Sequence, residues 1–153
     1  MTFLAIFLGA AGLPSEEFDE YSITKENSKV LDRFIQGAAQ NDKRLLASSI
    51  EYPLRRKYPI PPVSNAREMV QRFNHVFTRE LLTEIAQSSV ARNWSDVGWR
   101  GIMLNQGHIW ANYDGYVFAI NPQSKFEVEL QEHLVQLEKR YLHSSLGQKF
   151  CPS

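Results

Sequence analysis

The sequence predicts an α+β domain in which N-terminal helices pack on a curved antiparallel β-meander, with a helix at the C-terminal end. Two observations carry this prediction. Apolar residues recur at the helical period of about 3.6 before residue 90 and after residue 125, whereas between these points they recur at a period of about 2. Strands and helices do not alternate along the chain, as they would in a parallel doubly wound sheet.

Size and composition agree with one globular domain. The chain has 153 residues, of which 43% are hydrophobic, enough to bury a core. Its 17 Lys and Arg residues balance 17 Asp and Glu residues, so no net charge attracts nucleic acid, and we expect no nucleic-acid partner. The single cysteine, Cys151, excludes an intrachain disulfide and a cysteine-built zinc site.

Residues 1–12, MTFLAIFLGAAG, form an apolar run that is too short to span a bilayer but has the length of a signal-peptide core. The run ends in the small residues Gly9, Ala11 and Gly12, although no basic residue precedes it. We predict a signal segment at 1–12, a linker at 13–22, one domain at 23–145 and a tail at 146–153. The alternative is that the apolar run is a core helix or strand. The expected location is periplasmic or secreted, and cytoplasmic if the run is not an export signal.

Four helices are predicted before residue 90. The third is expected to run to about Val76, and the fourth to end in the polar cluster 87–89. Their expected N-caps, in chain order, are Ser22 or Thr24, Asn41 or Asp42, Ser64, and Thr78. Between the second and third helices, the segment 50–62 (IEYPLRRKYPIPP) contains repeated prolines, which predict an edge strand or a polyproline-like connection.

Three strands are predicted, over 99–104, 107–113 and 116–120. Asp114-Gly115 is typical of a two-residue type I′ hairpin turn. This turn predicts a register that pairs residues on two faces. The expected pairs are Tyr113 with Tyr116, Asn112 with Val117, Ala111 with Phe118, Trp110 with Ala119, and Ile109 with Ile120.

One face of this sheet is almost purely apolar and is expected to meet the helices. It carries Ile102, Leu104, Ile109, Ala111, Phe118 and Ile120. The second face carries Trp99, Met103, Trp110 and Asn112. A last helix is predicted over 125–143, with apolar residues at spacings of three and four. This helix either covers the second face as another core layer or leaves it as a pocket wall or docking patch.

The order of these elements resembles the start of the NTF2-like (SnoaL-like, cystatin-like) superfamily. More narrowly, YPLRRKYPIPP at 52–62 and WSDVGWRGIMLNQGHIWANYDGYVFAIN at 94–121 resemble uncharacterised exported bacterial proteins. The resemblance implies helices packed on a strongly curved antiparallel sheet around a pocket. The superfamily includes enzymes, binding modules and assembly factors, so it implies no particular activity. The chain departs from it by ending in a helix instead of further strands, which argues against a closed, deep pocket.

Residues for acid–base or metal chemistry are few. His108 begins a strand on the Trp110 face and is the first candidate base or ligand, but such a histidine more often lies on a rim. Asp114 is explained by the turn. Glu129 and His133 share a helical face but lack a third ligand, and no HExxH or GxSxG motif is present. We therefore expect no metal and no cofactor.

Two groups of residues are candidate binding surfaces. The first is Tyr52, Arg55, Arg56, Lys57 and Tyr58, whose cations could grip a carboxylate or phosphate or could protect a sheet edge. In an extended segment Arg55 and Lys57 point one way and Arg56 the other. The second group comprises Trp94, Asp96, Trp99, Arg100, Trp110, Asn112, Tyr113 and Tyr116. Asp96 is the expected partner of the Arg100 charge.

The absence of a catalytic motif, together with these aromatic and cationic residues, favours a binding domain over an enzyme. We predict that it recognises a protein partner, with an immunity or antitoxin role as one example, or a small ligand. The alternative is a small SnoaL-like enzyme that performs acid–base isomerisation or hydration, with His108 or Asp96 as base in a dead-ended cavity of about 300 Å³ or more. A third reading is a structural subunit that forms a homodimer through the C-terminal helix.

Overall fold

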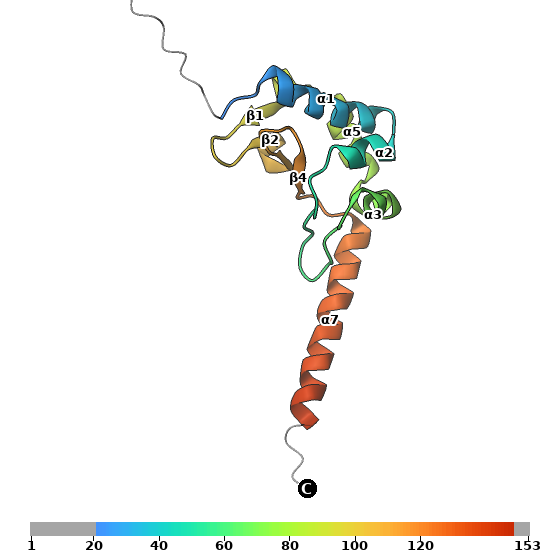
Figure 1. Ribbon diagram of the computed structural model, residues 1–153. Coiled ribbons are helices and arrows are strands. Elements are labelled where there is room, and N and C mark those ends of the chain that lie inside the picture. The colour runs from blue at the N-terminus through green and yellow to red at the C-terminus, as the bar shows by residue number, and fades with distance from the viewer. Residues whose placement is uncertain (1–20, 149–153) are drawn as a thin grey trace, which may run out of the picture.

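The computed structural model describes residues 21–148, and within them it confirms an α+β fold. The predicted signal segment at 1–12, most of the linker and residues 149–153 lie outside this range. The elements, in chain order, are α1 (Lys25–Ala39), α2 (Lys43–Ser48), α3 (Ala66–Gln71), α4 (Phe73–Val76), α5 (Arg79–Gln87), α6 (Val90–Asn93), β1 (Trp94–Asp96), β2 (Ile102–Leu104), the 3-10 turn η1 (Asn105–Gly107), β3 (Ile109–Ala111), β4 (Val117–Ile120) and α7 (Lys125–Gln148). The helices α1 to α5 lie beside the sheet, and α7 projects away from both (Figure 1).

Side-chain caps set the starts of the N-terminal helices. Thr24 caps α1 and Asp42 caps α2, and Thr78 accepts a hydrogen bond from the Leu81 amide at the start of α5, as predicted. The third prediction is wrong in two respects. Asn65, not Ser64, is the cap, and the expected single helix is divided into α3 and α4 at Arg72.

The four strands form an antiparallel sheet in the order β1-β2-β3-β4. Trp94–Asp96 is a strand that the sequence analysis did not predict, and the predicted strand over 99–104 begins only at Ile102. Met103 lies opposite Trp110, and Leu104 lies opposite Ile109, so the expected faces of β2 and β3 are confirmed. The switch to strand periodicity placed at residue 90 is wrong, because α6 occupies 90–93.

The β3–β4 hairpin differs from the predicted two-residue turn. Asn112 N–H donates to the carbonyl of Tyr116, which encloses a three-residue loop with Gly115 at φ +87°. Ala111 therefore lies opposite Val117, not Phe118, and the predicted pairs of Asn112 with Val117 and Tyr113 with Tyr116 are also wrong. A bulge at Phe118 then restores the predicted pairing of Trp110 with Ala119 and of Ile109 with Ile120.

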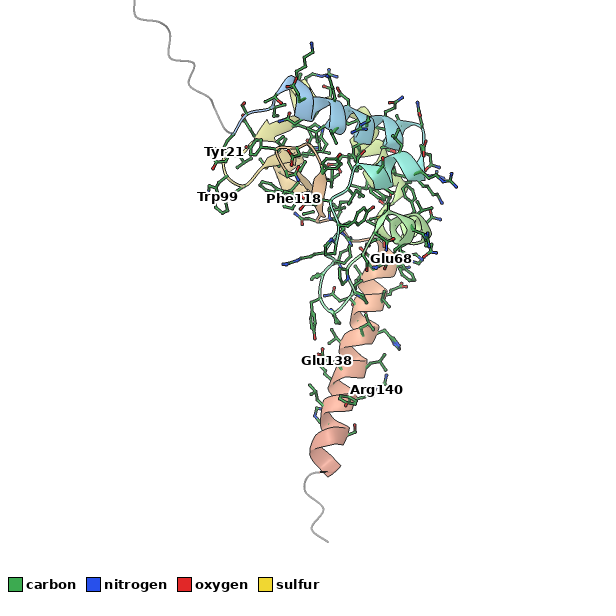
Figure 2. The ribbon with its side chains drawn as sticks, in the orientation of Figure 1. Tyr21, Glu68, Trp99, Phe118, Glu138 and Arg140 are labelled. Carbon is green, nitrogen blue, oxygen red and sulfur yellow. The ribbon has the colours of Figure 1, made fainter. Side chains whose placement is uncertain are left out.

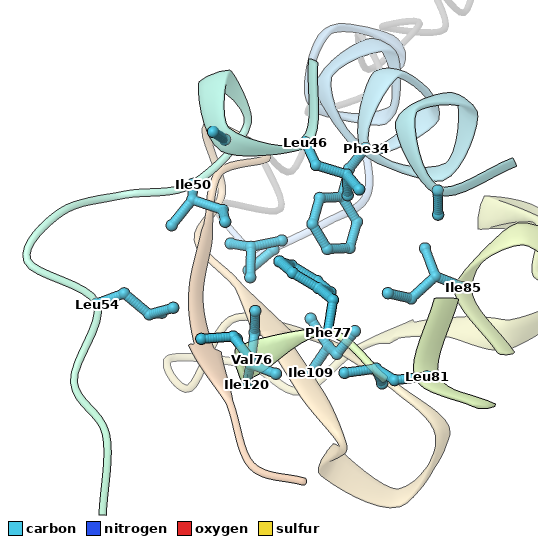
Figure 3. Close-up of a cluster of buried hydrophobic side chains, with 14 of the residues drawn as sticks. Phe34, Leu46, Ile50, Leu54, Val76, Phe77, Leu81, Ile85, Ile109 and Ile120 are labelled. Atoms are coloured by element: carbon cyan, nitrogen blue, oxygen red, sulfur yellow. The ribbon is translucent and has the colours of Figure 1, made fainter. Parts of the chain in front are cut away.

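One face of the sheet and the helices share a core, shown in Figure 3. Phe34 of α1 lies edge-on to Trp94 of β1, with ring centroids 6.4 Å apart. Val117 and Ile120 of β4 are buried in this core, whereas Phe118 is 37% exposed. The prediction that Phe118 belongs to the core face is therefore wrong, because the bulge places Phe118 beside Ala119 on the opposite face.

The proline-containing segment runs along the free edge of β4. Ile50 forms a parallel bridge with Val117, and Leu54 forms an antiparallel bridge with Val63, so the segment folds back on itself. Its Tyr52-Pro53 and Tyr58-Pro59 peptide bonds are cis. The segment therefore covers part of the β4 edge, in agreement with the expected extended conformation.

The helix α7 does not cover the second face of the sheet. It begins beside α4, continues to Gln148 beyond the predicted end at 143, and extends into solvent (Figure 1). The predicted second core layer under this helix is therefore wrong. Within the described residues, no helix combines the length and apolar character needed to cross a membrane.

Candidate functional site

Arg56 is a buried structural residue. Its side chain and that of Glu127 are each 1% exposed, and Arg56 Nε donates to Glu127 Oε1 at 2.7 Å while Nη2 donates to Oε2. Arg56 also donates to the carbonyls of Ile120 and Pro122. This fork-shaped ion pair joins the proline-containing segment to the end of β4 and to the first turn of α7. These contacts engage the guanidinium within the protein, although Arg56 also lines a hollow together with Arg55 and Lys57. The predicted role of Arg56 in a binding rim stays a prediction.

The two tyrosines of the first candidate group also fix this segment. Tyr52 Oη donates to the carbonyl of Ala47 at 2.9 Å, and burial raises the pKa of the phenol. Tyr58 is exposed, and its Oη donates to Glu138 Oε1 of α7 at 2.6 Å. This hydrogen bond, together with the negative charge of Glu138, raises the pKa of Tyr58. Both tyrosines thus have structural contacts.

Arg55 and Lys57 are exposed whereas the Arg56 side chain is buried, which agrees with the alternation of an extended chain. They border a hollow of about 330 Å³ that is also lined by Ala119, Asn121 and Gln123. Among the described residues, neither cation takes part in an ion pair. The cationic edge therefore lies next to β4 and reaches the sheet face on which Ala119 lies.

The face of the sheet opposite the core is open. Met103, Trp110 and Ala119 lie side by side on it through the strand register, and each remains partly exposed. The indole of Trp110 lies against Gly107, where a Cβ atom would come 3.0 Å from Trp110 Nε1. Gly107 therefore covers one side of the indole ring, and the rest of Trp110 contributes to an apolar surface.

Phe118 and Trp99 extend this apolar surface toward the β1–β2 loop. The Phe118 ring reaches Gly101, at whose position a Cβ would lie 3.5 Å from Phe118 Cε1. Trp99 is 79% exposed, and the Arg100 guanidinium lies 5.6 Å from the centroid of its ring. Figure 2 shows Trp99 and Phe118 on the side of the sheet away from α1. Phe118 could not be placed on this face from the sequence, because the bulge that turns it outward has no distinct residue pattern.

The remaining aromatic and charged candidates have other roles or positions. Trp94 is buried and its Nε1 donates to Ser88 Oγ at 3.1 Å. Trp99 lies in a loop, so the expectation that it shares a strand face with Met103 is wrong. The expected Arg100–Asp96 ion pair is not found among the described residues, and Arg100 contacts the Trp99 ring instead.

Asn112 and His108 are both committed to contacts within the protein. Asn112 Oδ1 accepts hydrogen bonds from the amides of Asp114 and Tyr116, and Nδ2 donates to Glu51 Oε2 at 2.6 Å. Asn112 therefore organises the hairpin loop. His108 Nδ1 lies 2.9 Å from Glu84 Oε1 at the surface, in the rim position that the sequence favoured.

The alternative enzymatic function requires a dead-ended cavity lined by His108 or Asp96. Neither side chain lines the hollow beside Arg55 or the larger open hollow beside α5 and the start of α7. Among the described residues, no cluster of three or more His, Cys, Asp or Glu side chains could hold a metal ion.

Comparisons with protein-family models, curated proteins and solved structures found no match to this chain. The resemblance to the NTF2-like superfamily therefore stays a prediction. The candidate site is defined by its own geometry, as a surface formed by Met103, Trp110, Phe118 and Ala119, extended by Trp99 and Arg100 and bordered by Arg55 and Lys57. We refer to it as the aromatic–basic surface.

Proposed function

We propose that this protein is a non-enzymatic binding domain whose aromatic–basic surface recognises an acidic, partly apolar segment of a partner protein. The observation that carries the proposal is the open sheet face itself. In most sheets of this kind the second face is polar, whereas here its centre is formed by Met103, Trp110 and Phe118. Partly exposed aromatic residues are enriched at protein–protein interfaces.

The charges next to this face favour an acidic partner. Arg55 and Lys57 lie at its β4 edge and Arg100 lies at its β1–β2 end, so cations border the apolar centre on two sides. A carboxylate near such an edge would gain charge-assisted hydrogen bonds while the apolar side chains of the same segment cover the rings. We expect the affinity to fall as the salt concentration rises, because exposed charges are screened.

A selection from a random displayed peptide library on the intact domain tests this function. We expect enriched peptides to combine Asp or Glu with apolar residues. Binding should weaken at least about tenfold in an Arg55→Glu/Lys57→Glu variant and in a Phe118→Ala variant. A tenfold loss of affinity corresponds to about 1.4 kcal/mol of binding free energy. These side chains are exposed, so the fold should survive their replacement.

The matched control is an Arg44→Glu/Arg67→Glu variant, which makes the same charge change at a separate hollow between α2 and α3. It should bind the selected peptides like the wild type. Enrichment of basic peptides, or equal losses in the control and the Arg55 variants, would contradict the proposed surface. Arg56 is unsuitable for this test, because its replacement removes a buried ion pair.

We further propose that the domain acts after export, on the basis of the apolar run at 1–12. N-terminal sequencing of the protein purified from its native source tests this location. A mature chain that begins after the small residues at the end of the run would support cleavage. An intact Met1 would contradict export by cleavage.

A further inference from the structure

We propose that α7 is a dimerisation helix that pairs in antiparallel orientation with α7 of a second copy of this chain. The first observation is the length of α7 that extends beyond the body of the domain, by which we mean the elements α1 to β4. A helix of 24 residues is about 36 Å long. Its contacts with the proline-containing segment are made by Glu127, Gln131 and Glu138, and residues 136–144 are all exposed. A single helix in water is of marginal stability, so a helix of this length favours a partner.

The second observation is an apolar stripe on the side that the proline-containing segment leaves open. At about 100° per residue, Phe126, Leu130, Leu137 and Tyr141 fall within about 60° of one another around the helix axis. The residues that contact the proline-containing segment lie on the adjoining side. Phe126, Leu137 and Tyr141 are 45%, 42% and 73% exposed. One face of the Phe126 ring stacks on His75 of α4, with ring centroids 3.9 Å apart, and the exposed parts of the stripe are available to another helix.

The spacing of the stripe is symmetric, which favours a second copy as the occupant. Phe126 and Tyr141 are equally far from the point between His133 and Leu134, and so are Leu130 and Leu137. An antiparallel pair about a two-fold axis at this point therefore places Phe126 against Tyr141 of the partner subunit and Leu130 against Leu137 of the partner subunit. Each contact then occurs twice, as in an isologous interface.

The charges beside the stripe fit the same arrangement. Glu129 and Arg140 lie on one flank of the stripe and on opposite sides of its midpoint, so the antiparallel pair brings them to within about two residues, or about 3 Å, of the same level. Glu129 also lies 3.7 Å from Lys125 of its own helix, at the exposed surface. In the antiparallel pair, Arg140 approaches Glu129 of the partner subunit, and the reciprocal pair also forms. A parallel pair would instead place each of these charges level with its own copy. The charge pattern thus selects the antiparallel orientation.

The base of α7 offers space for the far end of a partner helix. An open hollow of about 830 Å³ lies there, lined in part by Phe73, Phe77 and Phe126 and by the cations Arg79 and Lys125. In the antiparallel pair, the last turn of the partner helix reaches this hollow. The unpaired carbonyls at a helix C-terminus carry partial negative charge, which Arg79 and Lys125 would stabilise.

Light scattering coupled to size-exclusion chromatography of the full chain tests the dimer. We expect a dimer for the wild type and a monomer for Leu137→Glu, whose side chain lies outside the body. Glu129→Arg and Arg140→Glu should each weaken the dimer by about tenfold or more in Kd, and the double variant should recover it. Glu132→Arg, the same change on the opposite face of α7, is the matched control and should behave like the wild type.

Orientation is tested with spin labels at position 143 in a His143→Cys/Cys151→Ser chain. The antiparallel pair places the two labelled positions about 28 Å apart along the helix axis, whereas a parallel pair would bring them together. A wild-type chain that is monomeric up to its solubility limit would overturn the proposal. So would a dimer that Leu137→Glu leaves intact, no recovery in the double variant, or a short distance between the labels. Association of α7 only with a different protein would overturn it as well.

Discussion

Arg55, Arg56 and Lys57 are adjacent cations with different roles. An extended chain turns alternate side chains to opposite sides, so Arg55 and Lys57 meet solvent while Arg56 is buried against Glu127. The alternation could be predicted from the prolines around these residues. The partner could not, because Glu127 is 71 residues away along the chain and only the packing of α7 brings it close.

Replacing Arg56 by Ala should lower the free energy of unfolding by about 3–5 kcal/mol, because it leaves the Glu127 carboxylate buried without its counterion. Arg55→Ala, at the exposed neighbouring position, should change it by less than about 0.5 kcal/mol. Urea denaturation of both variants measures the difference. Equal effects of the two substitutions would show that the ion pair does not hold the segment to α7.

Gly115 and Gly98 both have positive φ, at +87° and +54°, but they differ in their surroundings. A Cβ at Gly115 would lie 2.5 Å from the carbonyl oxygen of Asn27, whereas a Cβ at Gly98 would meet nothing within 4 Å. Gly98→Ala should therefore cost about 1–2 kcal/mol, from backbone strain alone. Gly115→Ala should cost clearly more, because the hairpin loop must also move away from α1. Thermal unfolding of the two variants compares them.

Among the elements, the β3–β4 hairpin has a longer loop than its local sequence predicts. Asp-Gly between two apolar runs favours a two-residue turn, but Asn112 caps the loop with its side chain and lengthens it by one residue. The bulge at Phe118 compensates, so β4 still buries Ile120. The position of the bulge depends on burial of Val117 against the helices. The alternation of apolar residues along a strand does not predict this burial.

The start of α3 gives a prediction about pH. Glu68 accepts a hydrogen bond from the Ser64 amide at 2.8 Å and pairs with Arg72 at 3.0 Å, and these contacts lower the pKa of its carboxyl group. Folding therefore favours the ionised form. The resulting stabilisation is complete above the usual carboxyl pKa of about 4.3 and is lost as the pH falls through the lower folded-state value.

A Glu68→Gln variant should accordingly lose stability at neutral pH and should show a weaker decline in stability between about pH 5 and pH 3 than the wild type. Urea midpoints measured across this range test the prediction. Glu132→Gln, at a position with no hydrogen bond or ion pair in the described part of the chain, should retain the wild-type profile. A steeper decline in Glu68→Gln would contradict the assigned direction.

At the scale of the whole molecule, the body and the distal part of α7 are separate in their contacts. Arg56, Tyr58 and Ser124 hold α7 as far as Glu138, while residues 139–144 are exposed. The open sheet face and the stripe on α7 are also separate surfaces. Loss of dimerisation and loss of peptide binding should therefore be observed independently of one another.

A chain that ends at Glu138 should keep the stability of the body within about 0.5 kcal/mol when compared at a concentration at which the full chain is monomeric. A chain that ends at Phe126 removes Glu127 and should lose about as much stability as Arg56→Ala does. Chemical denaturation of both truncated chains measures this. A large loss in the longer one would show that the distal part of α7 packs on the body.

The amino-acid sequence alone was enough to predict the α+β class, the N-terminal caps of three helices, the buried faces of β2 and β3, and the alternation around Arg56. These features depend on the period of apolar residues and on hydrogen bonds between near neighbours, which are local in the chain. Three features could be seen only in the folded molecule: α7 leaves the sheet uncovered, Phe118 turns outward, and Arg56 pairs with Glu127. These depend on contacts between distant segments, for which a single sequence contains no spacing rule.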